Sequence, residues 1–459
     1  MSVEYKVVNP ATGVVEREFP TATDAEIAAA VTRADEAFRE WSARPVVERA
    51  KVIHHVAELY VERSDDLAAI ISREMGKATA DAVGEVSYVA EIYRYYADNA
   101  AELLADQPIP SASGQAIIRK APLGPLLGIM PWNYPYYQVA RFAGPNLLAG
   151  NTVLLKHAPQ CPESALAMEA IFVEAGVPTD AYINIFATNE QVAEILADPR
   201  VRGVSVTGSE RAGTAVAALA GAHLKKVVLE LGGSDAYLIL DTDDLPGVVE
   251  AAVAGRMENG GQACNAAKRF IVMDHLYDEF VDGLTAAMAA LRTGDPFDPD
   301  VDYGPLSSEA AVTGLAAQVQ DAIEKGATVR TGGKRVEGPG AFFEATVLTD
   351  VTPHMRAFRE ELFGPVAVVY KVATIDEAVD HANDSPFGLG GAVFHTDTAI
   401  ALEVADRLDT GMVFINAPEG GGPELPFGGT KRSGVGRELG PLGIEEFLNK
   451  KLIHVPSAH

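Results

Sequence analysis

Cysteine is scarce in this chain of 459 residues, which contains only Cys161 and Cys264. Two thiols exclude a disulfide framework and a zinc site built from several cysteines, and they fit a reducing compartment. The N-terminus has no apolar stretch after a basic start, and no apolar run reaches the roughly 18 residues that a membrane helix needs. We therefore expect a soluble, cytoplasmic protein.

Basic residues are also few, because 37 Lys and Arg face 64 Asp and Glu, for a net charge of −27. Such an excess repels phosphates, so we expect neither a nucleic acid nor a membrane surface as partner. The motifs H-E-x-x-H and G-x-S-x-G are absent, and we expect no metal site and no serine hydrolase. A G-x-G-x-x-G motif is missing too, since Leu439 stands where the third glycine after Gly434 and Gly436 belongs.

Apolar residues recur at helical spacing within residues 22–105, and the segment 107–125 is rich in proline and glycine. The first pattern predicts helices, and the second predicts a connecting segment or an arm. Farther along, short apolar runs alternate with helical stretches, which predicts parallel sheets covered on both faces. The expected strands lie at 126–130, 152–155, 182–185, 201–206, 226–229, 236–240, 270–273, 366–370, 392–394 and 412–415.

This alternation predicts an α/β fold with two parallel-sheet domains. We place the first at 1–106 together with 126–235, and the second at 236–418. Segments 107–125 and 419–459 then form a discontinuous arm and a tail, and the tail ends in a strand-like run at 451–456.

Cys264 follows two glycines in the segment Asn259-Gly-Gly-Gln-Ala-Cys-Asn. The glycines let the backbone approach a substrate, and successive N–H groups can face a developing negative charge. A free thiol is only about 3% ionised at pH 7, so a nucleophile here needs a base or an electropositive pocket. Glu230, at the end of an expected strand, could act as that base or activate a water molecule. The alternative is a structural turn residue, and for Cys161 we favour a buried filler.

A second candidate site begins at Gly208 and Ser209, directly after the expected strand 201–206. A helix that starts close to Gly213 would aim N–H groups and a helix dipole at one spot, as phosphate sites do. The equal alternative is that Ser209 is an ordinary helix N-cap. Lys156 ends the strand 152–155, and we expect it to be an exposed cation at the edge of the sheet where α/β proteins bind ligands.

Seven segments in this order resemble the aldehyde dehydrogenase superfamily, and the resemblance covers nearly the whole chain. It implies a Rossmann-like cofactor-binding domain, a catalytic domain around Cys264, and an arm that assembles a homodimer or homotetramer. The segments are Pro131-Trp-Asn-Tyr, Lys156, Gly208-Ser209 with Gly213, Glu230-Leu-Gly-Gly, Gly261-Gln-Ala-Cys, Glu361-Leu-Phe-Gly-Pro and Pro426-Phe-Gly-Gly.

The resemblance also implies roles for single residues. Cys264 would attack an aldehyde to give a thiohemiacetal, and hydride transfer would leave a thioester. The Asn133 amide and the Cys264 backbone N–H would form the oxyanion hole, and Glu230 would activate the water that hydrolyses the thioester. The implied cofactor-binding residues are Trp132, Lys156, His157, Pro159, Gly208, Ser209, Gly213, Leu231, Glu361 and Phe363.

One departure from the superfamily concerns the cofactor. Relatives that prefer NAD often carry Glu three residues after the lysine, where this chain has Pro159. Without that carboxylate nothing repels a 2′-phosphate, and Lys156 with His157 could attract it. We therefore expect NADP to be preferred, with NAD also accepted.

Arg141 falls where the superfamily lines its substrate tunnel, beside the implied substrate-binding residues Tyr134 and Phe427. An arginine there can bind a substrate carboxylate, and short bacterial succinate-semialdehyde dehydrogenases carry one at this position. Longer members have a second arginine where this chain has Glu258, and Arg141 could instead pair with an internal carboxylate. We expect a carboxylated substrate, succinic semialdehyde.

The alternatives are another small aldehyde, a CoA-acylating dehydrogenase and a non-catalytic descendant. CoA-acylating relatives usually lack the base that Glu230 supplies. A non-catalytic descendant has no need to retain Cys264, Glu230 and Asn133 together.

Overall fold

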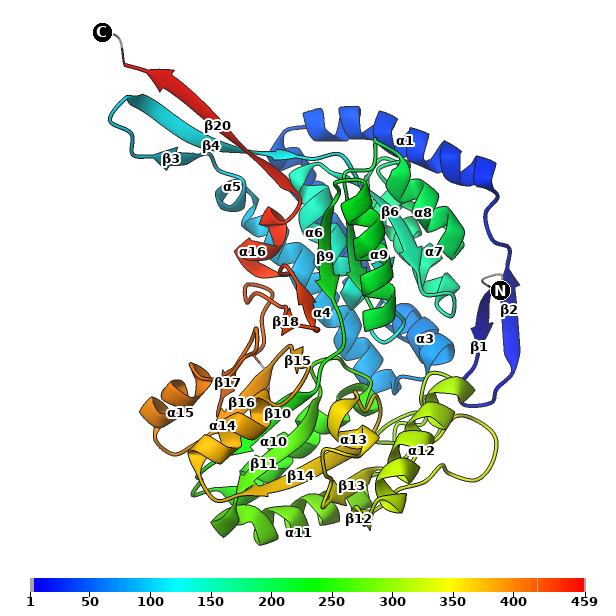
Figure 1. The fold of residues 1–459 in the computed structure, drawn as a ribbon. Coiled ribbons are helices and arrows are strands. Elements are labelled where there is room, and N and C mark those ends of the chain that lie inside the picture. The colour runs from blue at the N-terminus through cyan, green and yellow to red at the C-terminus, as the bar shows by residue number, and fades with distance from the viewer. Residues whose placement is uncertain (1–3, 419, 458–459) are drawn as a thin grey trace.

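The computed structural model describes residues 4–418 and 420–457, which form two α/β lobes and a projecting arm (Figure 1). The first lobe contains a six-stranded sheet in the order β19-β9-β8-β5-β6-β7. All its pairings are parallel except that of β19 with β9. Its strands are β5 (Pro125–Met130), β6 (Thr152–His157), β7 (Tyr182–Asn184), β8 (Gly203–Thr207), β9 (Lys226–Glu230) and β19 (Gly434–Val435).

The second lobe contains a seven-stranded sheet in the order β12-β13-β14-β11-β10-β16-β17. Only the edge pair of β12 and β13 is antiparallel. The strands are β10 (Asp235–Ile239), β11 (Ala267–Met273), β12 (Thr328–Thr331), β13 (Thr346–Thr349), β14 (Val366–Val372), β16 (Gly391–Phe394) and β17 (Phe414–Ile415).

Helices cover both sheets, as the alternation of strands and helices predicts. Those of the first lobe are α1 (Asp24–Ala43), α2 (Val46–Glu62), α3 (Ser64–Met75), α4 (Thr79–Asp98), α5 (Ala100–Leu103), α6 (Tyr137–Ala149), α7 (Pro162–Ala175), α8 (Asn189–Ala197) and α9 (Glu210–Ala222). Those of the second lobe are α10 (Leu245–Met257), α11 (Asp274–Ala290), α12 (Glu309–Glu324), α13 (Arg356–Arg359), α14 (Ile375–Asn383) and α15 (Thr398–Ala405), and the short helix η1 (Glu258–Gly261) follows α10.

The arm is a three-stranded antiparallel sheet that projects from the first lobe (Figure 1). It joins β3 (Gln107–Ile109) and β4 (Gly114–Pro122) to the C-terminal strand β20 (Leu448–Pro456). The sequence predicted a connecting segment or an arm at 107–125, without a strand of this length. The longer strand forms because β20 pairs with β4 along its whole length, from Gly114 to Pro122.

Several helices and strands were not predicted from the sequence, and each omission has a physical reason. Helix α6 is buried on nearly every side and contains Pro145, so it shows no amphipathic period. The hairpin of β1 (Tyr5–Val8) and β2 (Val15–Phe19) was missed because β2 is exposed and charged. Strands β12 and β13 have only four residues each, and β12 lies at the edge of the sheet.

The tail after residue 418 contributes to more than the arm. Strand β18 (Thr430–Lys431) pairs with β15 (Phe387–Gly388), and β19 extends the sheet of the first lobe. Helix α16 (Gly440–Glu445) packs near α6 before β20 begins. The tail therefore pairs with strands of both lobes. The sequence predicted only an arm and a tail at 419–459 and did not predict these contacts.

Candidate active site

The first sheet changes its winding direction between β5 and β8, because the chain runs β5-β6-β7 to one side and β8-β9 to the other. Parallel α/β sheets bind ligands at the carboxyl ends of the strands at such a point. Asn133 follows the end of β5, Gly208 follows β8, and Glu230 is the last residue of β9. The fold therefore gathers three of the implied site residues at one edge of the sheet.

Cys264 comes from the other lobe, in the loop that enters β11. Asn259, Gly260 and Gly261 all have positive φ angles of 50°, 62° and 78° in this loop. A Cβ atom at Gly261 would lie 2.2 Å from the carbonyl oxygen of Gly364, so glycine is required there. The tight turn brings Cys264 to the amino end of the second sheet, opposite the carboxyl edge of the first.

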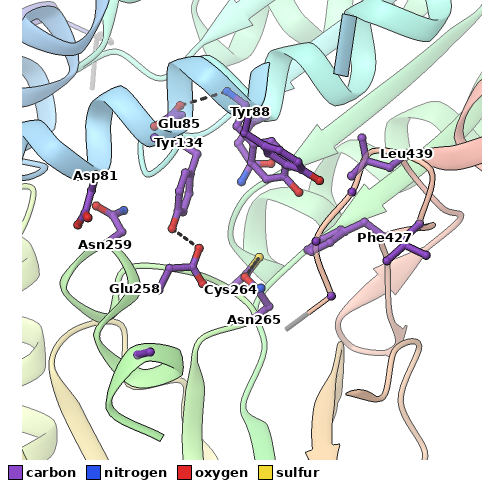
Figure 2. Close-up of a pocket in the computed structure, with 18 of the residues that line it drawn as sticks. Asp81, Glu85, Tyr88, Tyr134, Glu258, Asn259, Cys264, Asn265, Phe427 and Leu439 are labelled. Atoms are coloured by element: carbon purple, nitrogen blue, oxygen red, sulfur yellow. Dashed lines mark hydrogen bonds between the residues drawn. The ribbon is translucent and has the colours of Figure 1, made fainter. Parts of the chain in front are cut away.

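Cys264 lines two cavities. One, of about 630 Å³, is also lined by Tyr134, Tyr137, Glu258 and Phe427. Figure 2 shows Cys264 between Tyr134 and Phe427 in this larger cavity. The other, of about 200 Å³, is lined by Trp132, Asn133, Gly208, Ser209, Glu230, Leu231, Gly232, Glu361 and Phe363. The thiol therefore lies where two ligands can meet.

Asn133 is buried and its amide nitrogen donates a 2.9 Å hydrogen bond to the carbonyl oxygen of Gln262. An amide NH₂ has two hydrogens, so one remains for an oxygen in the smaller cavity. Asn259 supports the arrangement by donating to the carbonyl of Asn133 at 2.8 Å. The two loops that carry Asn133 and Cys264 are thus bonded directly to each other.

The Glu230 carboxyl group is 1% exposed, and neither of its oxygens has a hydrogen-bond partner among the described residues. Burial raises the pKa of Glu230 well above its usual value, and the neighbouring carboxyl group of Glu438 raises it further. Burial also raises the pKa of Cys264 to about 12, which the charges of Arg141 and Lys268 oppose. An unbonded carboxyl group with a raised pKa can act as a base near neutral pH.

The smaller cavity fits the dinucleotide end implied by the sequence. A Cβ atom at Gly232 would lie 2.4 Å from Glu361, whose carboxylate accepts a hydrogen bond from Gly233 N–H at 3.0 Å. The rings of Trp132 and Phe363 meet edge to face at a centroid distance of 5.5 Å. The residues lining this cavity thus offer aromatic edges and a carboxylate that can bind a nicotinamide ribose.

The start of α9 shows how Ser209 and Gly213 act. Ser209 is exposed and its hydroxyl accepts from Ala212 N–H, so the expected N-cap alternative is present. A Cβ atom at Gly208 would meet nothing within 4 Å, which leaves open space above the helix N-terminus. At Gly213 a Cβ atom would lie 2.5 Å from the Leu231 side chain, so this glycine allows helix and strand to pack closely.

Two cofactor expectations need correction. Lys156 is 6% exposed rather than an exposed cation, and burial lowers its pKa to about 8. His157 is 1% exposed; its Nε2 bonds to the Pro135 carbonyl and its Nδ1 accepts from Ala158 N–H. Burial lowers the pKa of His157 to about 4, so it is neutral and supplies no charge for a 2′-phosphate. Lys156 remains the candidate cation.

Beyond Lys156, Pro159 accepts a hydrogen bond from Lys6 N–H at 3.0 Å through its carbonyl. This bond ties the loop after β6 to the N-terminal hairpin. No carboxylate occupies position 159, so nothing at that position repels an anionic group.

Arg141 has an internal partner. Its Nε lies 2.8 Å from Glu438, and both side chains are buried. The guanidinium also donates to Gln138 and lies 4.2 Å from the centre of the Phe427 ring. Phe427, Tyr137 and Gln138 line the larger cavity, and Arg141 lies behind them. The internal pairing that the sequence left open is therefore present.

Several residues of the larger cavity were not found from the sequence. Lys77 and Glu85 form a buried ion pair, and the Lys77 ammonium lies 3.5 Å from the centre of the Tyr134 ring. The Tyr134 hydroxyl donates to Glu258 (Figure 2). Lys77 lies two residues before α4 and Glu85 lies within it, and in the sequence both look like ordinary charged residues of a helical region.

Among the described residues, no group of three or more His, Cys, Asp or Glu side chains could hold a metal ion. No helix in the described part of the chain is long and apolar enough to cross a membrane.

Comparison with known proteins agrees with this geometry. Residues 2–453 match the aldehyde dehydrogenase family. A succinate-semialdehyde dehydrogenase (NADP+) of Deinococcus radiodurans is 57% identical over 449 residues, which are 98% of this chain and 94% of that protein. Succinate-semialdehyde dehydrogenase (NADP+) 1 of Mycobacterium tuberculosis is 46% identical over 451 residues, 98% of this chain and 99% of that protein.

Among solved structures, a succinic semialdehyde dehydrogenase from Streptococcus pyogenes in complex with NADP+ matches with a TM-score of 0.97. It is 41% identical, and the match covers 99% of this chain and 100% of that one. The resemblance and the fold class that the sequence predicted are confirmed. This chain belongs to the aldehyde dehydrogenase family.

Proposed function

We propose that this enzyme oxidises succinic semialdehyde to succinate, with NADP+ preferred over NAD+. One observation carries the reaction type: Cys264 lines both the larger and the smaller cavity. A thiol shared by two cavities can attack an aldehyde in one of them, and the hydride on the former aldehyde carbon can then leave toward the other. The substrate and cofactor named for the relatives support the specific choice.

In the proposed reaction the Cys264 sulfur attacks the aldehyde carbon, and its proton passes to Glu230 or to water. The oxygen of the resulting thiohemiacetal receives hydrogen bonds from the Asn133 amide and the Cys264 backbone N–H. Removing one such donor typically costs about 3 kcal/mol of transition-state stabilisation. Both donors stand on loops held by the bonds described above, so they need no rearrangement.

A nicotinamide bound in the smaller cavity would supply the hydride acceptor for this oxidation, and the thiohemiacetal on Cys264 would become a thioester. Glu230 takes a proton from water, and the resulting hydroxide attacks the thioester to release the acid. The sum is aldehyde, water and NADP+ giving acid, NADPH and a proton. Trp132, Phe363 and Glu361 would hold the nicotinamide end, and Leu231 and Gly232 line the same cavity.

At the other end of the cofactor, Lys156 would bind the 2′-phosphate, because position 159 has no carboxylate to oppose it. Gly208, Ser209 and Gly213 would place the pyrophosphate against the open N-terminus of α9. The Ser209 hydroxyl caps this helix in the absence of ligand, and its exposed position leaves it within reach of one.

Arg141 is our candidate for the substrate's carboxylate. Its guanidinium has five N–H donors, of which Glu438, Gln138 and Tyr137 engage only part. Direct contact requires the Phe427 ring to move aside, since Arg141 lies behind it. We propose that Glu438 holds Arg141 in place and that the positive charge of Arg141 attracts the substrate carboxylate. The carboxylate would then lie against the wall formed by Tyr137, Gln138 and Phe427, with Tyr134 on the facing side.

The test is kcat/KM for succinic semialdehyde and for butyraldehyde, each with NADP+ and NAD+. We expect a preference of about tenfold or more for the acid substrate, equal to about 1.4 kcal/mol. The double variant Arg141→Met/Glu438→Gln removes both charges and leaves neither unpaired. It should lose the preference and keep butyraldehyde oxidation, whereas an unchanged preference would place the carboxylate site elsewhere.

The arm and the compartment are further proposals. We infer a homodimer or homotetramer held by the arm, whose strand β20 forms an exposed edge with Leu452 61% and Val455 59% exposed. A free catalytic thiol needs a reducing environment, which supports a cytoplasmic location.

A further inference from the structure

Lys268, the second residue of β11, lies buried beneath the loop that carries Cys264 and is 1% exposed. Its ammonium donates to three backbone carbonyls of that loop. The acceptors are the oxygens of Ala263 at 3.1 Å, Cys264 at 3.0 Å and Ala266 at 3.1 Å. An ammonium has three N–H donors, so these bonds satisfy all of them.

The bond to the carbonyl of Ala263 has a consequence for Cys264. That carbonyl and the N–H of Cys264 belong to one peptide group, which is planar and trans, so the two point in opposite directions. A carbonyl drawn down onto Lys268 turns the Cys264 N–H up and away from it. Among the described residues no hydrogen bond is found from this N–H, which is therefore left for an oxygen in the cavity.

The hydrogen bond from Lys268 to the Cys264 carbonyl fixes the next peptide group in the same way. That peptide group also contains the N–H of Asn265. Lys268 also lies 3.6 Å from the Glu361 carboxylate, which borders the smaller cavity. A second buried cation, Arg256, donates to the carbonyl of Gly261 at 2.7 Å. The loop is thus held from below by two charges, and Lys268 is the one at the nucleophile.

We propose that Lys268 is a positioning residue for the reaction, which aims the backbone N–H of Cys264 at the substrate oxygen by holding the carbonyls of the loop. This inference rests on the proposed function, in which Cys264 is the nucleophile. Lys268 is not among the residues that line either cavity, so we place it behind the loop, where it acts by holding the carbonyls and not by contact with substrate or cofactor.

Two reactions of the same thiol separate this role from a simple effect on thiol ionisation. Acylation by p-nitrophenyl acetate passes through an oxyanion, whereas alkylation by iodoacetamide does not. Both need the thiolate, whose pKa depends on Lys268 and Arg141, which lower it, and on Glu361 and Glu230, which raise it. A change in thiolate population affects both rates alike at one pH, so the ratio of the two rates responds to the oxyanion hole and not to ionisation of the thiol.

The test variant is Lys268→Met, which keeps the length of the side chain and removes its donors. We expect the ratio of acylation to alkylation to fall about tenfold or more, since one oxyanion donor is worth up to about 10³ in rate. Lys268→Arg, which keeps several donors, should recover part of the ratio. With aldehyde and cofactor, kcat should fall much more than KM rises.

The matched control is Lys225→Met. The Lys225 ammonium also donates to two carbonyls of a loop, those of Asp198 and Val201, but this loop lies away from the site. The control should leave the ratio unchanged. If Lys268→Met does not fold, Lys268→Gln takes its place, because its amide offers donors to fewer carbonyls, and the same ratio decides.

An unchanged ratio would overturn the inference. If both rates fell equally, Lys268 would act only through its charge on the thiol, and if neither fell, Lys268 would have no role in the reaction. Failure of the proposed function looks different: wild type would not be acylated, or Cys264→Ser would be acylated as fast as wild type. Cys161 is fully buried, so it contributes no background.

Discussion

The Nε atom of Arg141 lies 2.8 Å from a carboxylate oxygen of Glu438, and the two side chains are 0% and 5% exposed. Glu438 also accepts a hydrogen bond from Ser205 at 3.0 Å. The pair therefore links α6, the last part of the chain and the sheet of the first lobe. Its charges also reach Glu230, whose pKa Glu438 raises and Arg141 lowers.

Breaking this pair from one side should destabilise the protein. Arg141→Met leaves the Glu438 carboxylate buried without its partner, which typically costs about 3 to 5 kcal/mol. Thermal unfolding measures the effect, and the double variant Arg141→Met/Glu438→Gln should recover most of the loss. A single variant as stable as wild type would show that the two groups do not depend on each other.

A second prediction concerns pH. Glu230 and Cys264 both act in their deprotonated forms, and burial raises the pKa of each. Raised pKa values mean that the active forms still gain population as pH rises above 7, so kcat should keep increasing on the alkaline side of neutrality. An ordinary glutamate base would instead give a rate that is flat above about pH 5. A flat profile in wild type would contradict the raised values.

Lys156 gives a prediction for the cofactor. Burial lowers its pKa to about 8, so the cation that would bind a 2′-phosphate is lost as pH rises through that value. The KM for NADP+ should therefore increase above pH 8, while the KM for NAD+ should change little. Lys156→Met should remove the difference between the two profiles. Parallel profiles in wild type would mean that Lys156 does not contact the phosphate.

The arm gives a prediction for assembly. The double variant Leu452→Glu/Val455→Glu places two negative charges on the exposed edge strand β20. Charged edges prevent strands from pairing, so the oligomer should dissociate, as light scattering would show. Val173→Glu is the control, because Val173 is 43% exposed on α7 and lies outside the arm. A double variant with the mass of wild type would place the interface elsewhere.

The features that depend on local patterns and motifs could be predicted from the sequence. The strand endings placed Glu230 and Gly208 at the edge of one sheet, and the glycines before Cys264 indicated a tight loop. Burial is a property of the folded chain, so the sequence could not show that His157 is enclosed and neutral. In sequence it looked like a second cation beside Lys156.

Contacts between residues far apart in the chain could not be predicted from the sequence either. Nothing near Arg141 indicates that Glu438 returns to pair with it, because that contact depends on how the tail crosses both lobes. No role was predicted for Lys268, because nothing in its neighbouring residues indicates that a loop folds over it. Only the loop conformation turns three carbonyls toward its ammonium.

The proposed mechanism requires Cys264 to carry the acid's acyl group as a thioester that Glu230 hydrolyses. It is tested most directly by incubating Glu230→Gln with succinic semialdehyde and NADP+ and mapping the modified peptide by mass spectrometry. We predict one burst of NADPH with no sustained turnover, and a succinyl group on the peptide that contains Cys264. Sustained turnover in this variant, or a burst without an acyl group on Cys264, would contradict the account.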